Sequence, residues 1–481
     1  MQHTRRTKII ATLGPASNSE EMIGNLIDAG ANFFRLNFSH GTHEAHLSSV
    51  QMIRKIAKMK NQFIGILADL QGPKIRVGEI DGGGINLKTG DTLTITTRPL
   101  LGNQKEVSTT YLNLPMDIKP GDKILLDDGL LTFQVKAIDI NNGDVECEVI
   151  YGGKLKSKKG INLPNVDISA PSLTEQDRVN AIFAMELDVD YFALSFVRRS
   201  EDVKDLKDLL KKHGKDIPVI AKLERQEALD NFDAIIKIAD GIMVARGDLG
   251  VEMPAEKVPM IQKQVIRKCN IAGKPVITAT QMLESMIQHP KPTRAEVSDV
   301  ANAILDGTDA IMLSGETAVG EYPIDAVKKM VDIAVEIELS SPILYSRRHG
   351  VNQYPEDDVE ETIAMAACDI AKNLKVKTIL SWTQCGCNIR LLSKFHPLSL
   401  IIALTESEKI ARQVQLLWGV FPLMLPASFN KNKDWKSLCQ SLIDKGLANS
   451  TDLMIVTETT NSESIDKMNS LKVVNYSDSF L

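Results

Sequence analysis

The sequence predicts an α/β protein whose main domain is a split TIM (β/α)8 barrel, with an inserted all-β lid domain and a C-terminal open α/β domain. Short apolar runs alternate with helical stretches in two separate parts of the chain, and a stretch rich in Gly, Thr, Val and Ile lies between them. A second αβ series begins near Ser340. We therefore expect the barrel at residues 1–71 and 170–339, the β-barrel lid at 72–169, and the last domain at 340–481.

Eight barrel strands are expected, each a short apolar run that a helical stretch separates from the next. Helices at about Ser19–Ala29 and His43–Met59 separate the first three runs, and Asn18 or Ser19 is suited to be an N-cap. Strands are expected at Lys8–Ala11, Phe33–Asn37, Ile64–Asp69, Tyr191–Ser195, Val219–Lys222, Gly241–Val244, Val276–Ala279 and Ala310–Leu313.

Turn signals occur at short intervals in the inserted module, and alternating runs such as Thr92–Thr96 lie between them. Strands of period two bounded by such turns are typical of a small barrel or sandwich. The turn signals are Gly82-Gly83-Gly84, Lys88-Thr89-Gly90-Asp91, Lys119-Pro120-Gly121-Asp122 and Asn141-Asn142-Gly143-Asp144.

The last domain is expected to start with a helix at Val359–Asn373 and to continue as an open sheet with helices. Its strands are expected at Lys377–Ser381, Leu398–Leu404, Val420–Leu425, Leu453–Thr457 and Lys472–Tyr476.

The composition excludes two classes of partner. The chain has 481 residues and a net charge of −6, so no basic bias points to nucleic acid. No apolar run approaches the ~18 residues that span a bilayer, and the basic N-terminus precedes a run too short for a signal peptide. We therefore expect a soluble, cytoplasmic protein without a membrane partner.

The six cysteines are scattered through the chain without a framework spacing, which favours reduced thiols over disulfides. Cys385-Gly386-Cys387 is the only close pair. A metal site would need more Cys or His nearby, so we interpret this spacing as incidental.

Polar residues follow the apolar part of nearly every barrel strand. In a TIM barrel the carboxyl ends of the strands meet at one face, and polar residues there are typically catalytic. A single Thr or Ser in such a place is more often structural, but the whole set indicates a reaction site. The set consists of Thr12, Arg35, Asn37, Ser39, Asp69, Ser195, Lys222, Glu224, Asp248, Thr278, Thr280, Ser314 and Glu316.

Glu224 and Asp248 are hard oxygen donors at the ends of neighbouring strands, which favours Mg²⁺ or Mn²⁺ held by two carboxylates and substrate oxygens. The alternative is that these acids pair with Arg246 or Lys222. Lys222 lies two residues before Glu224, so both side chains point to the same face of the strand. An ammonium beside a metal suits the charge that develops on an enolate or a transferring phosphoryl group.

Backbone amides and arginines complete an anion site. The glycines around Asp248 allow the amides of Gly247 and Asp248 to approach a small carboxylate closely. Arg35 and Arg76 are suited to phosphate oxygens, because a guanidinium binds them in a bidentate manner. Arg76 lies at the hinge of the inserted module, so this module is expected to act as a lid over the site.

Several strings of the chain, in order and over nearly its whole length, resemble the pyruvate kinase family. They are Arg35-Leu-Asn37-Phe-Ser39-His40-Gly41, Asp69-Leu-Gln-Gly-Pro-Lys-Ile-Arg76, Lys159-Gly-Ile-Asn-Leu-Pro164, Lys222-Leu-Glu224, Met243-Val-Ala-Arg-Gly-Asp-Leu-Gly250, Lys274-Pro-Val-Ile-Thr-Ala-Thr-Gln-Met-Leu-Glu284, Pro292-Thr-Arg-Ala-Glu296 and Leu313-Ser-Gly-Glu-Thr317.

The resemblance implies a glycolytic enzyme of bacterial type that transfers the phosphoryl group of phosphoenolpyruvate to ADP, giving pyruvate and ATP. It implies a homotetramer and a regulatory C-terminal domain that takes a phosphorylated allosteric effector. The resemblance implies that Glu224 and Asp248 are the metal ligands and that Lys222, Thr280 and Arg35 are the catalytic residues. The substrate-binding residues that it implies are Arg35, Gly247, Asp248, Thr280, Ser195 and Ser314. The nucleotide-binding residues that it implies are Arg76, His40, Lys159 and Asn37.

The chain departs from the family pattern at the monovalent-cation pocket, which the resemblance places at Asn37, Ser39, Asp69 and Leu70. Many members have a glutamate where this chain has Lys74. A fixed ammonium supplies the charge that K⁺ would bring, so we expect that K⁺ is not required. The alternative is that Lys74 is a hinge lysine that faces solvent and does not replace K⁺.

The chain also departs from the family pattern at the effector loop, which reads Thr383, Gln384, Cys385, Gly386, Cys387 and Asn388. It lacks the small hydroxyl donors and the lysine that hold a phosphate in regulated members, so a sugar-phosphate effector is not expected to bind strongly. A cradle of backbone amides at the following helix is the alternative.

Two rival functions remain at this point. A metal-dependent barrel lyase or aldolase acting on pyruvate or its enolate would share the acids, the metal and an arginine, but it would need neither a β lid nor a nucleotide-side lysine. A non-catalytic scaffold is expected to lack at least one of Lys222, Glu224 and Asp248, and all three are present.

Overall fold

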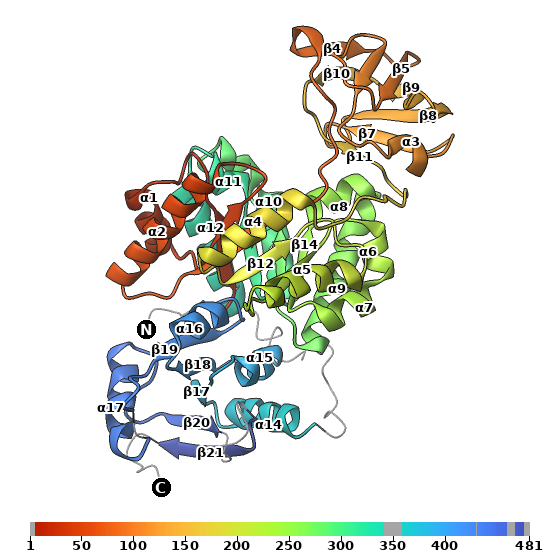
Figure 1. Cartoon of the computed structure of the whole chain (residues 1–481). Coiled ribbons are helices and arrows are strands. Elements are labelled where there is room, and N and C mark those ends of the chain that lie inside the picture. The colour runs from red at the N-terminus through yellow and green to blue at the C-terminus, as the bar shows by residue number, and fades with distance from the viewer. Residues whose placement is uncertain (1–4, 341–357, 430, 459–466, 476–481) are drawn as a thin grey trace.

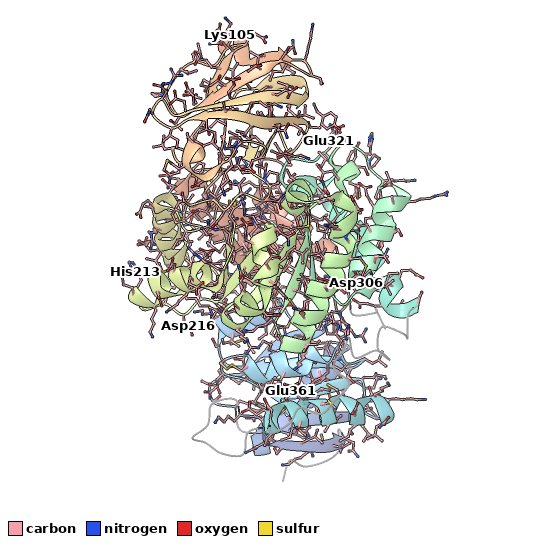
Figure 2. All side chains as sticks on the ribbon, turned by 90° about the vertical axis from the view of Figure 1, so that its right-hand side faces the viewer. Lys105, His213, Asp216, Asp306, Glu321 and Glu361 are labelled. Carbon is pink, nitrogen blue, oxygen red and sulfur yellow. A yellow bond between two sulfur atoms is a disulfide. The ribbon has the colours of Figure 1, made fainter. Side chains whose placement is uncertain are left out.

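The computed structural model describes residues 5–340, 358–429, 431–458 and 467–475. The chain forms three domains stacked along one axis, with the β lid at one end, the barrel in the middle and the C-terminal domain at the other end (Figure 1). Figure 2, turned by 90°, shows the same order, with Lys105 at the tip of the lid and Glu361 in the C-terminal domain.

Eight parallel strands close the barrel in the order β1-β16-β15-β14-β13-β12-β3-β2. Almost every strand residue is buried, and the half-buried exceptions in this set are Arg35 and Asn37 of β2. The expected split TIM barrel is therefore confirmed. The strands are β1 (Lys8–Thr12), β2 (Phe33–Asn37), β3 (Gly65–Asp69), β12 (Tyr191–Leu194), β13 (Val219–Leu223), β14 (Gly241–Ala245), β15 (Val276–Ala279) and β16 (Ala310–Leu313).

Helices cover the outside of the barrel, and α1, α2, α4 and α10 begin at side-chain caps. Ser19 is the N-cap of the first helix, because its hydroxyl accepts from the Met22 amide, and Gly30 ends that helix in the left-handed region at φ 115°. The barrel helices are α1 (Glu20–Ala29), α2 (His43–Met59), α4 (Glu175–Glu186), α5 (Ser200–Lys212), α6 (Gln226–Asp230), α7 (Phe232–Ile238), α8 (Arg246–Glu252), α9 (Val258–Ala272), α10 (Arg294–Leu305), α11 (Gly315–Ala318) and α12 (Pro323–Ser340), with the 3-10 turns η2 (Ala255–Lys257) and η3 (Glu284–Ile287).

The lid has its own core and two sheets, one in the order β11-β7-β8-β9-β5-β6 and a smaller one formed by β10 and β4. Fully buried side chains such as Leu93, Phe133 and Val145 alternate with outward-facing polar ones, as the period-two pattern predicts. Its elements are η1 (Asp81–Gly83), β4 (Gly84–Leu87), β5 (Thr92–Thr96), β6 (Glu106–Ser108), α3 (Leu114–Asp117), β7 (Lys123–Leu126), β8 (Leu131–Asp139), β9 (Asp144–Tyr151), β10 (Gly153–Lys156) and β11 (Ile161–Asn162).

The C-terminal domain is a five-stranded sheet in the order β19-β18-β17-β20-β21, in which only the β20–β21 pair is antiparallel. The last strand begins two residues before the expected Lys472, and residue 476 lies outside the described residues. The elements are α14 (Val359–Asn373), β17 (Thr378–Trp382), α15 (Cys387–Lys394), β18 (Leu400–Thr405), α16 (Glu408–Val414), β19 (Val420–Met424), α17 (Lys431–Asp444), β20 (Leu453–Glu458) and β21 (Ser470–Asn475).

Helix α16 holds the C-terminal domain against the amino ends of the barrel strands. The Arg412 guanidinium pairs with Asp190 at 2.8 Å and with Asp188 at 2.7 Å. The Tyr191 hydroxyl, at the start of β12, donates to the carbonyl of Gln413 at 3.2 Å. The opposite face, where the strands end, is thereby left to the lid.

The expectation that all cysteines are reduced is wrong for one pair, because Cys385 and Cys387 form a disulfide. Gly386 between them has φ 80°, a left-handed turn that folds the chain back and places the two Cα atoms 5.5 Å apart. The other four cysteines, Cys147, Cys269, Cys368 and Cys439, are buried free thiols.

No helix in the described part of the chain is both long enough and apolar enough to cross a bilayer.

Candidate active site

Lys222 lies near the end of β13 and joins three neighbouring strand ends. Its ammonium donates to Ser195 Oγ at 2.7 Å, and it lies 2.8 Å from Glu224 Oε1 and 3.3 Å from Asp69 Oδ1. Ser195 follows β12, Asp69 ends β3, and Glu224 follows β13. Parallel strands thus bring together four of the predicted residues.

The charges of this cluster stabilise one another. Burial alone would lower the pKa of Lys222, but the carboxylates of Asp69 and Glu224 outweigh it and raise that pKa above its ordinary value. Burial alone would raise the pKa of Asp69, but Lys222 and Arg35 outweigh it and lower that pKa. Lys222 therefore carries a fixed positive charge, and Asp69 a fixed negative one.

Glu224 and Asp248 form a pair of acids with different exposure. Glu224 is 1% exposed, and its Oε2 accepts from the Phe196 amide at 2.7 Å. Burial raises the pKa of Glu224, Lys222 opposes this, and the nearby charge of Asp248 raises the pKa further. Asp248 lies exposed in the first turn of α8.

These two acids fit a hard divalent cation, since such an ion relieves the repulsion between carboxylates and prefers oxygen ligands. Across the described residues no group of three or more His, Cys, Asp or Glu side chains is placed to hold a metal. Two protein carboxylates would leave the other coordination positions to substrate oxygens and water, which is the usual arrangement for Mg²⁺.

Thr280 lies in a turn after β15 with a left-handed backbone, at φ 67°, and Gln281 follows at φ 52°. Such conformations cost on the order of 1–3 kcal/mol each in residues other than glycine and persist only where the surroundings hold them. Arg246 holds this turn, because its guanidinium donates to the carbonyls of Thr280 at 2.8 Å and Gln281 at 3.1 Å. Arg246 pairs with Asp299 at 2.8 Å and not with the predicted metal ligands.

The Gly247 amide, which the sequence predicts to hold a substrate carboxylate, donates to Thr280 Oγ1 at 2.7 Å. The first amides of α8 and the Thr280 hydroxyl therefore lie together. A small carboxylate bound here would accept the hydrogen bond that the Gly247 amide now donates to the Thr280 hydroxyl.

Arg35 and Ser314 extend the site toward β1. The Arg35 guanidinium binds Asp69 Oδ2 at 2.6 Å and Thr12 Oγ1 at 3.2 Å. Ser314 Oγ is buried, and among the described residues it has no hydrogen-bond partner. A buried hydroxyl without such a partner, at the end of the strand next to β1, is consistent with the predicted substrate contact.

Thr278 and Glu316, two other members of the predicted face, are structural. Thr278 Oγ1 donates to Thr308 Oγ1 at 3.0 Å inside the barrel wall. The Glu316 carboxylate accepts from the amides of Leu283 and Ser314 at 3.0 and 2.7 Å. Both satisfy buried polar groups, as a minority of strand-end residues do.

The predicted nucleotide-side residues of the barrel, Asn37 and His40, line a cavity of about 490 Å³ together with Thr12. Burial lowers the pKa of His40, and Lys74, Arg76 and Arg35 lower it further in that order. The imidazole is therefore kept neutral beside three cations, which is an environment suited to phosphate oxygens.

The nucleotide-side residues of the lid do not line this cavity. Lys159 pairs with Asp127 at 2.7 Å, and the Arg76 guanidinium donates to the carbonyl of Lys158 at 3.0 Å. Lys159 is thus held by a carboxylate of the lid and would have to leave it to reach a phosphate.

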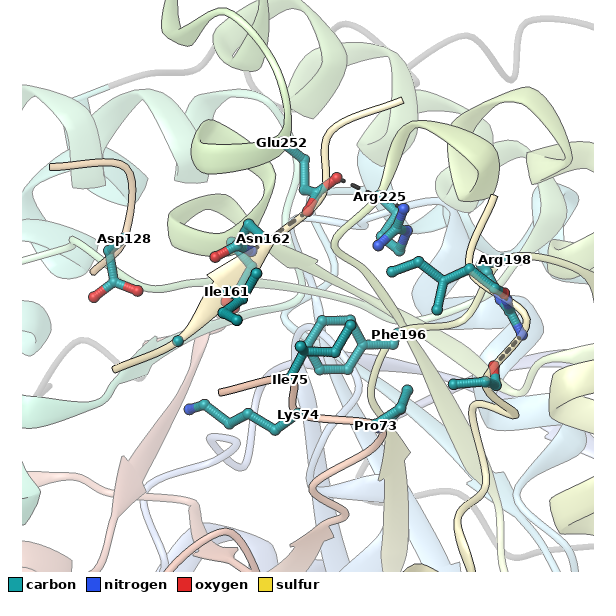
Figure 3. A pocket seen from close by; sticks show the side chains of 14 residues that line it. Pro73, Lys74, Ile75, Asp128, Ile161, Asn162, Phe196, Arg198, Arg225 and Glu252 are labelled. Atoms are coloured by element: carbon teal, nitrogen blue, oxygen red, sulfur yellow. Dashed lines mark hydrogen bonds and ion pairs between the residues drawn. The ribbon is translucent and has the colours of Figure 1, made fainter. Parts of the chain in front are cut away.

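Lys74 is exposed and lines a cavity of about 60 Å³ between lid and barrel, with Asp128 and Asp248. Figure 3 shows its ammonium on the same side of the cavity as the Asp128 carboxylate. Burial and Arg76 lower the pKa of Lys74, while Asp248 and Asp128 oppose this. The direct cationic partners of Asp69 are Arg35 and Lys222, so Lys74 does not occupy the predicted monovalent-cation pocket in this structure.

The remaining residues of that pocket are engaged locally. Asn37 Oδ1 accepts from the Ser39 amide at 3.1 Å. The Leu70 carbonyl accepts from Ser195 Oγ at 2.7 Å.

In the predicted effector loop, the side chains of Thr383 and Asn388 turn inward. Thr383 Oγ1 accepts from the Gly386 amide at 2.8 Å, and buried Asn388 donates to Ser381 Oγ at 3.0 Å. Gln384, Cys385 and Cys387 are exposed, and the two sulfurs are bonded to each other. The hydroxyl of Thr383, the one hydroxyl side chain of this loop, is thus engaged within the loop itself.

Two buried arginines that sequence reasoning missed attach the segment after β11, in which the chain returns from the lid to the barrel. Arg225 donates to the carbonyl of Val166 at 2.8 Å, and Arg198 donates to the carbonyl of Ala170 at 2.8 Å. Both lie within four residues of the end of a barrel strand, Arg198 after β12 and Arg225 after β13, so the search for polar residues after the strands could have found them. Figure 3 shows them on the barrel side of the cavity, opposite Lys74.

Comparisons with known proteins agree with this geometry. The family model described as pyruvate kinase, barrel domain, matches residues 4–327, and the one described as pyruvate kinase, alpha/beta domain, matches residues 361–474. Pyruvate kinases of Staphylococcus epidermidis and Staphylococcus aureus are 46% identical over 455 residues, which is 94% of this chain and 77% of each relative.

A solved structure of a pyruvate kinase from Cryptosporidium parvum superposes with a TM-score of 0.91 at 39% sequence identity, covering 98% of this chain and 96% of that one. Both family models, the curated relatives and the solved structure agree over nearly the whole length. The chain therefore belongs to the pyruvate kinase family of enzymes.

Proposed function

We propose that this enzyme transfers the phosphoryl group of phosphoenolpyruvate to ADP by a metal-held in-line displacement, followed by protonation of enolpyruvate. The transfer from phosphoenolpyruvate to ADP, giving pyruvate and ATP, is the reaction of the family. The main support for this mechanism is the position of the Lys222 ammonium, which Ser195, Glu224 and Asp69 hold within one buried cluster.

Glu224 and Asp248 would hold Mg²⁺ or Mn²⁺. When bound, the ion would supply charge neutralisation for the phosphoryl oxygens and the developing enolate. Glu224 is kept in place by the Phe196 amide and Lys222, and Asp248 by the first turn of α8.

Lys222 stabilises the negative charge on the transferring group and on the enolate left behind. Its charge is fixed before the substrate arrives, because Asp69 and Glu224 raise its pKa. Preorganised charge of this kind needs no rearrangement during the reaction and lowers the barrier most effectively.

Thr280 positions the substrate carboxylate together with the Gly247 and Asp248 amides, near the carbon that takes the proton. The support is the 2.7 Å bond from the Gly247 amide to Thr280 Oγ1. Arg35 and Ser314 complete the contacts on the side of β1, and Ser314 brings a hydroxyl without a partner among the described residues.

The nucleotide binds between barrel and lid, with Asn37 and His40 on one side and Arg76 and Lys159 on the other. The cavity at His40 and the three cations around that imidazole support this assignment. Lid closure brings Lys159 close to the nucleotide phosphates, where its ammonium exchanges Asp127 for phosphate oxygens, and the closed lid separates the transfer from water.

No monovalent cation is required in this proposal, because Lys74 supplies the charge once the lid closes. Asp69 is already paired with Arg35 and Lys222, and the Leu70 carbonyl already accepts from Ser195. The enzyme works as a cytoplasmic homotetramer, as the family does, and any phosphorylated effector at the loop after β17 binds weakly.

One coupled assay tests the function. Pyruvate should appear from phosphoenolpyruvate only when ADP and Mg²⁺ are both present. Pyruvate formation without ADP would favour the barrel lyase or aldolase instead, and no turnover with either metal would favour the scaffold.

A further inference from the structure

The Cys385–Cys387 bridge calls for an explanation other than stability. A disulfide stabilises a fold mainly by closing a long loop in the unfolded chain, and this bridge spans only two positions of sequence. It also lies outside the site assigned above, in the loop between β17 and α15.

The accessibility of the cysteines separates this pair from the other four. Cys385 and Cys387 are exposed, whereas Cys147, Cys269, Cys368 and Cys439 are buried. Burial raises the pKa of Cys147 to about 12 and that of Cys439 to about 11, and it raises the pKa of Cys269 as well. Since the thiolate is the reactive form, thiol chemistry in the folded chain is confined to the exposed pair.

The surroundings of the pair favour a thiolate leaving group. Cys387 is the first residue of α15, and Arg390 lies one turn later on the same helix. The bridge and Arg390 line one cavity of about 90 Å³ between the C-terminal domain and the barrel, together with Tyr191 and Asp240. A helix N-terminus and a guanidinium both stabilise a sulfur anion, and a stable leaving thiolate speeds disulfide exchange.

The glycine between the two cysteines packs against α16, the helix that joins the domains. A Cβ at Gly386 would lie 3.1 Å from Val414 Cγ1, so the turn held by the bridge packs closely on α16. The same helix carries Arg412, which pairs with Asp190, and Gln413, whose carbonyl accepts from Tyr191.

We propose that Cys385–Cys387 is a redox-active site at which low-molecular-weight thiols such as glutathione exchange with the bridge in the folded enzyme, and that opening it loosens the loop on α16. One glutathione thiolate attacks a sulfur of the bridge, the S–S bond breaks, and the released cysteine thiolate takes a proton. A second glutathione thiolate resolves the mixed disulfide. Two electrons pass to the protein, leaving two cysteine thiols and glutathione disulfide.

The experiment counts thiols in the folded enzyme. The protein is equilibrated in glutathione buffers from fully oxidised to fully reduced, labelled with iodoacetamide, and digested for mass spectrometry. We expect no label on Cys385 or Cys387 in the oxidised buffer and both labelled in the reduced one, with the other four labelled only in denaturant. Free Cys385 and Cys387 in the oxidised buffer, or labelling that requires denaturant, overturns the proposal.

Two variants separate exchange from mere structure. Arg390→Gln should slow opening of the bridge by glutathione by about threefold or more while leaving the final number of labels unchanged. The pair Cys385→Ser and Cys387→Ser should show the fast amide hydrogen exchange of α16 that wild type shows only after reduction. An α16 exchange rate equal in oxidised and reduced wild type overturns the coupling to this helix.

Discussion

Lys222 and Lys8 are two buried lysines of the same barrel, at opposite ends of its strands. Lys222 is surrounded by Ser195, Glu224 and Asp69, and its pKa is raised. Lys8 is 1% exposed at the start of β1, donates to the Val420 carbonyl at 2.5 Å and lies over the Phe421 ring. Burial lowers the pKa of Lys8 to about 7, Arg5 adds to this, and Glu338 and Asp309 compensate only in part.

The comparison shows that burial by itself does not make a lysine catalytic. Removing an ammonium from water disfavours its charge at both ends of the barrel, and only directly placed carboxylates reverse this. At the strand ends such carboxylates hold a cation ready for an anionic substrate. At the opposite end a carbonyl and an aromatic ring hold Lys8 as part of the contact with the C-terminal domain.

The largest expected effect is the loss of Lys222. Lys222→Met keeps the bulk and removes the charge, so kcat should fall by at least ~10³, whereas KM for phosphoenolpyruvate should change little. Lys8→Met is the matched control and should retain kcat within about twofold, because Lys8 lies outside the reaction face. Steady-state kinetics of both variants measure this, and a near-normal kcat of Lys222→Met would exclude the assigned role.

The next effect concerns the two acids beside Lys222. Glu224→Gln and Asp248→Asn each remove an anionic ligand, so the Mg²⁺ concentration at half-maximal rate should rise by about tenfold or more. Glu338→Gln is the control, since this buried carboxylate accepts from the Thr7 amide and hydroxyl just before β1, at the opposite end of the barrel. The acids are not ligands if both variants saturate at the wild-type Mg²⁺ concentration.

The next prediction tests whether a third lysine, Lys74, adds its positive charge to the cluster of Lys222, Glu224 and Asp69. The initial rate should change by less than about twofold between tetramethylammonium and about 100 mM KCl at matched ionic strength. Lys74→Glu should lower activity and create a K⁺ stimulation, because it replaces a fixed cation by an anion. A tenfold or larger K⁺ stimulation of wild type contradicts the proposal.

Lys8, at the end of the barrel that contacts the C-terminal domain, should affect the free energy of unfolding rather than kcat. With a pKa of about 7 when folded and an ordinary value of 10.5, Lys8 is neutral in the native chain and charged in the unfolded chain between these limits. Stability therefore rises with pH across this window, by up to roughly 5 kcal/mol, and the cost of the buried charge is present in full below pH 7.

Lys8→Met should remove this slope between pH 7 and 10, as urea unfolding at several pH values would measure. Asp309, whose pKa burial raises to about 7, titrates below this window and leaves the slope unchanged. Parallel stability profiles of wild type and Lys8→Met would show that Lys8 keeps its ordinary pKa.

The smallest effect is expected at the loop after β17. Fructose 1,6-bisphosphate should change the rate by less than about twofold, because Thr383 and Asn388 are turned inward and the loop carries a disulfide in place of hydroxyl donors. Rates at subsaturating phosphoenolpyruvate measure this, and strong activation at micromolar concentration would contradict it.

Local patterns in the sequence predicted the strands and helices that position the site. Phe33–Asn37, His43–Met59 and Val276–Ala279 have the predicted bounds, because apolar period and capping residues act within a few positions. The convergence of Asp69, Ser195, Lys222 and Glu224 followed from strand ends that must meet at one face of a parallel barrel.

Only the tertiary structure decided which of these groups pair and which are strained. The binding of the Gly247 amide to Thr280, the pairing of Arg246 with Asp299, and the place of Lys74 beside Asp128 depend on residues distant in sequence. The sequence placed Lys8 at the start of the first strand without indicating its burial, and it gave Cys385 and Cys387 as an incidental pair. Packing of the C-terminal domain buries Lys8, and the left-handed backbone of Gly386 brings the two sulfurs together. Burial and backbone direction arise from contacts between segments and leave no local pattern in the sequence.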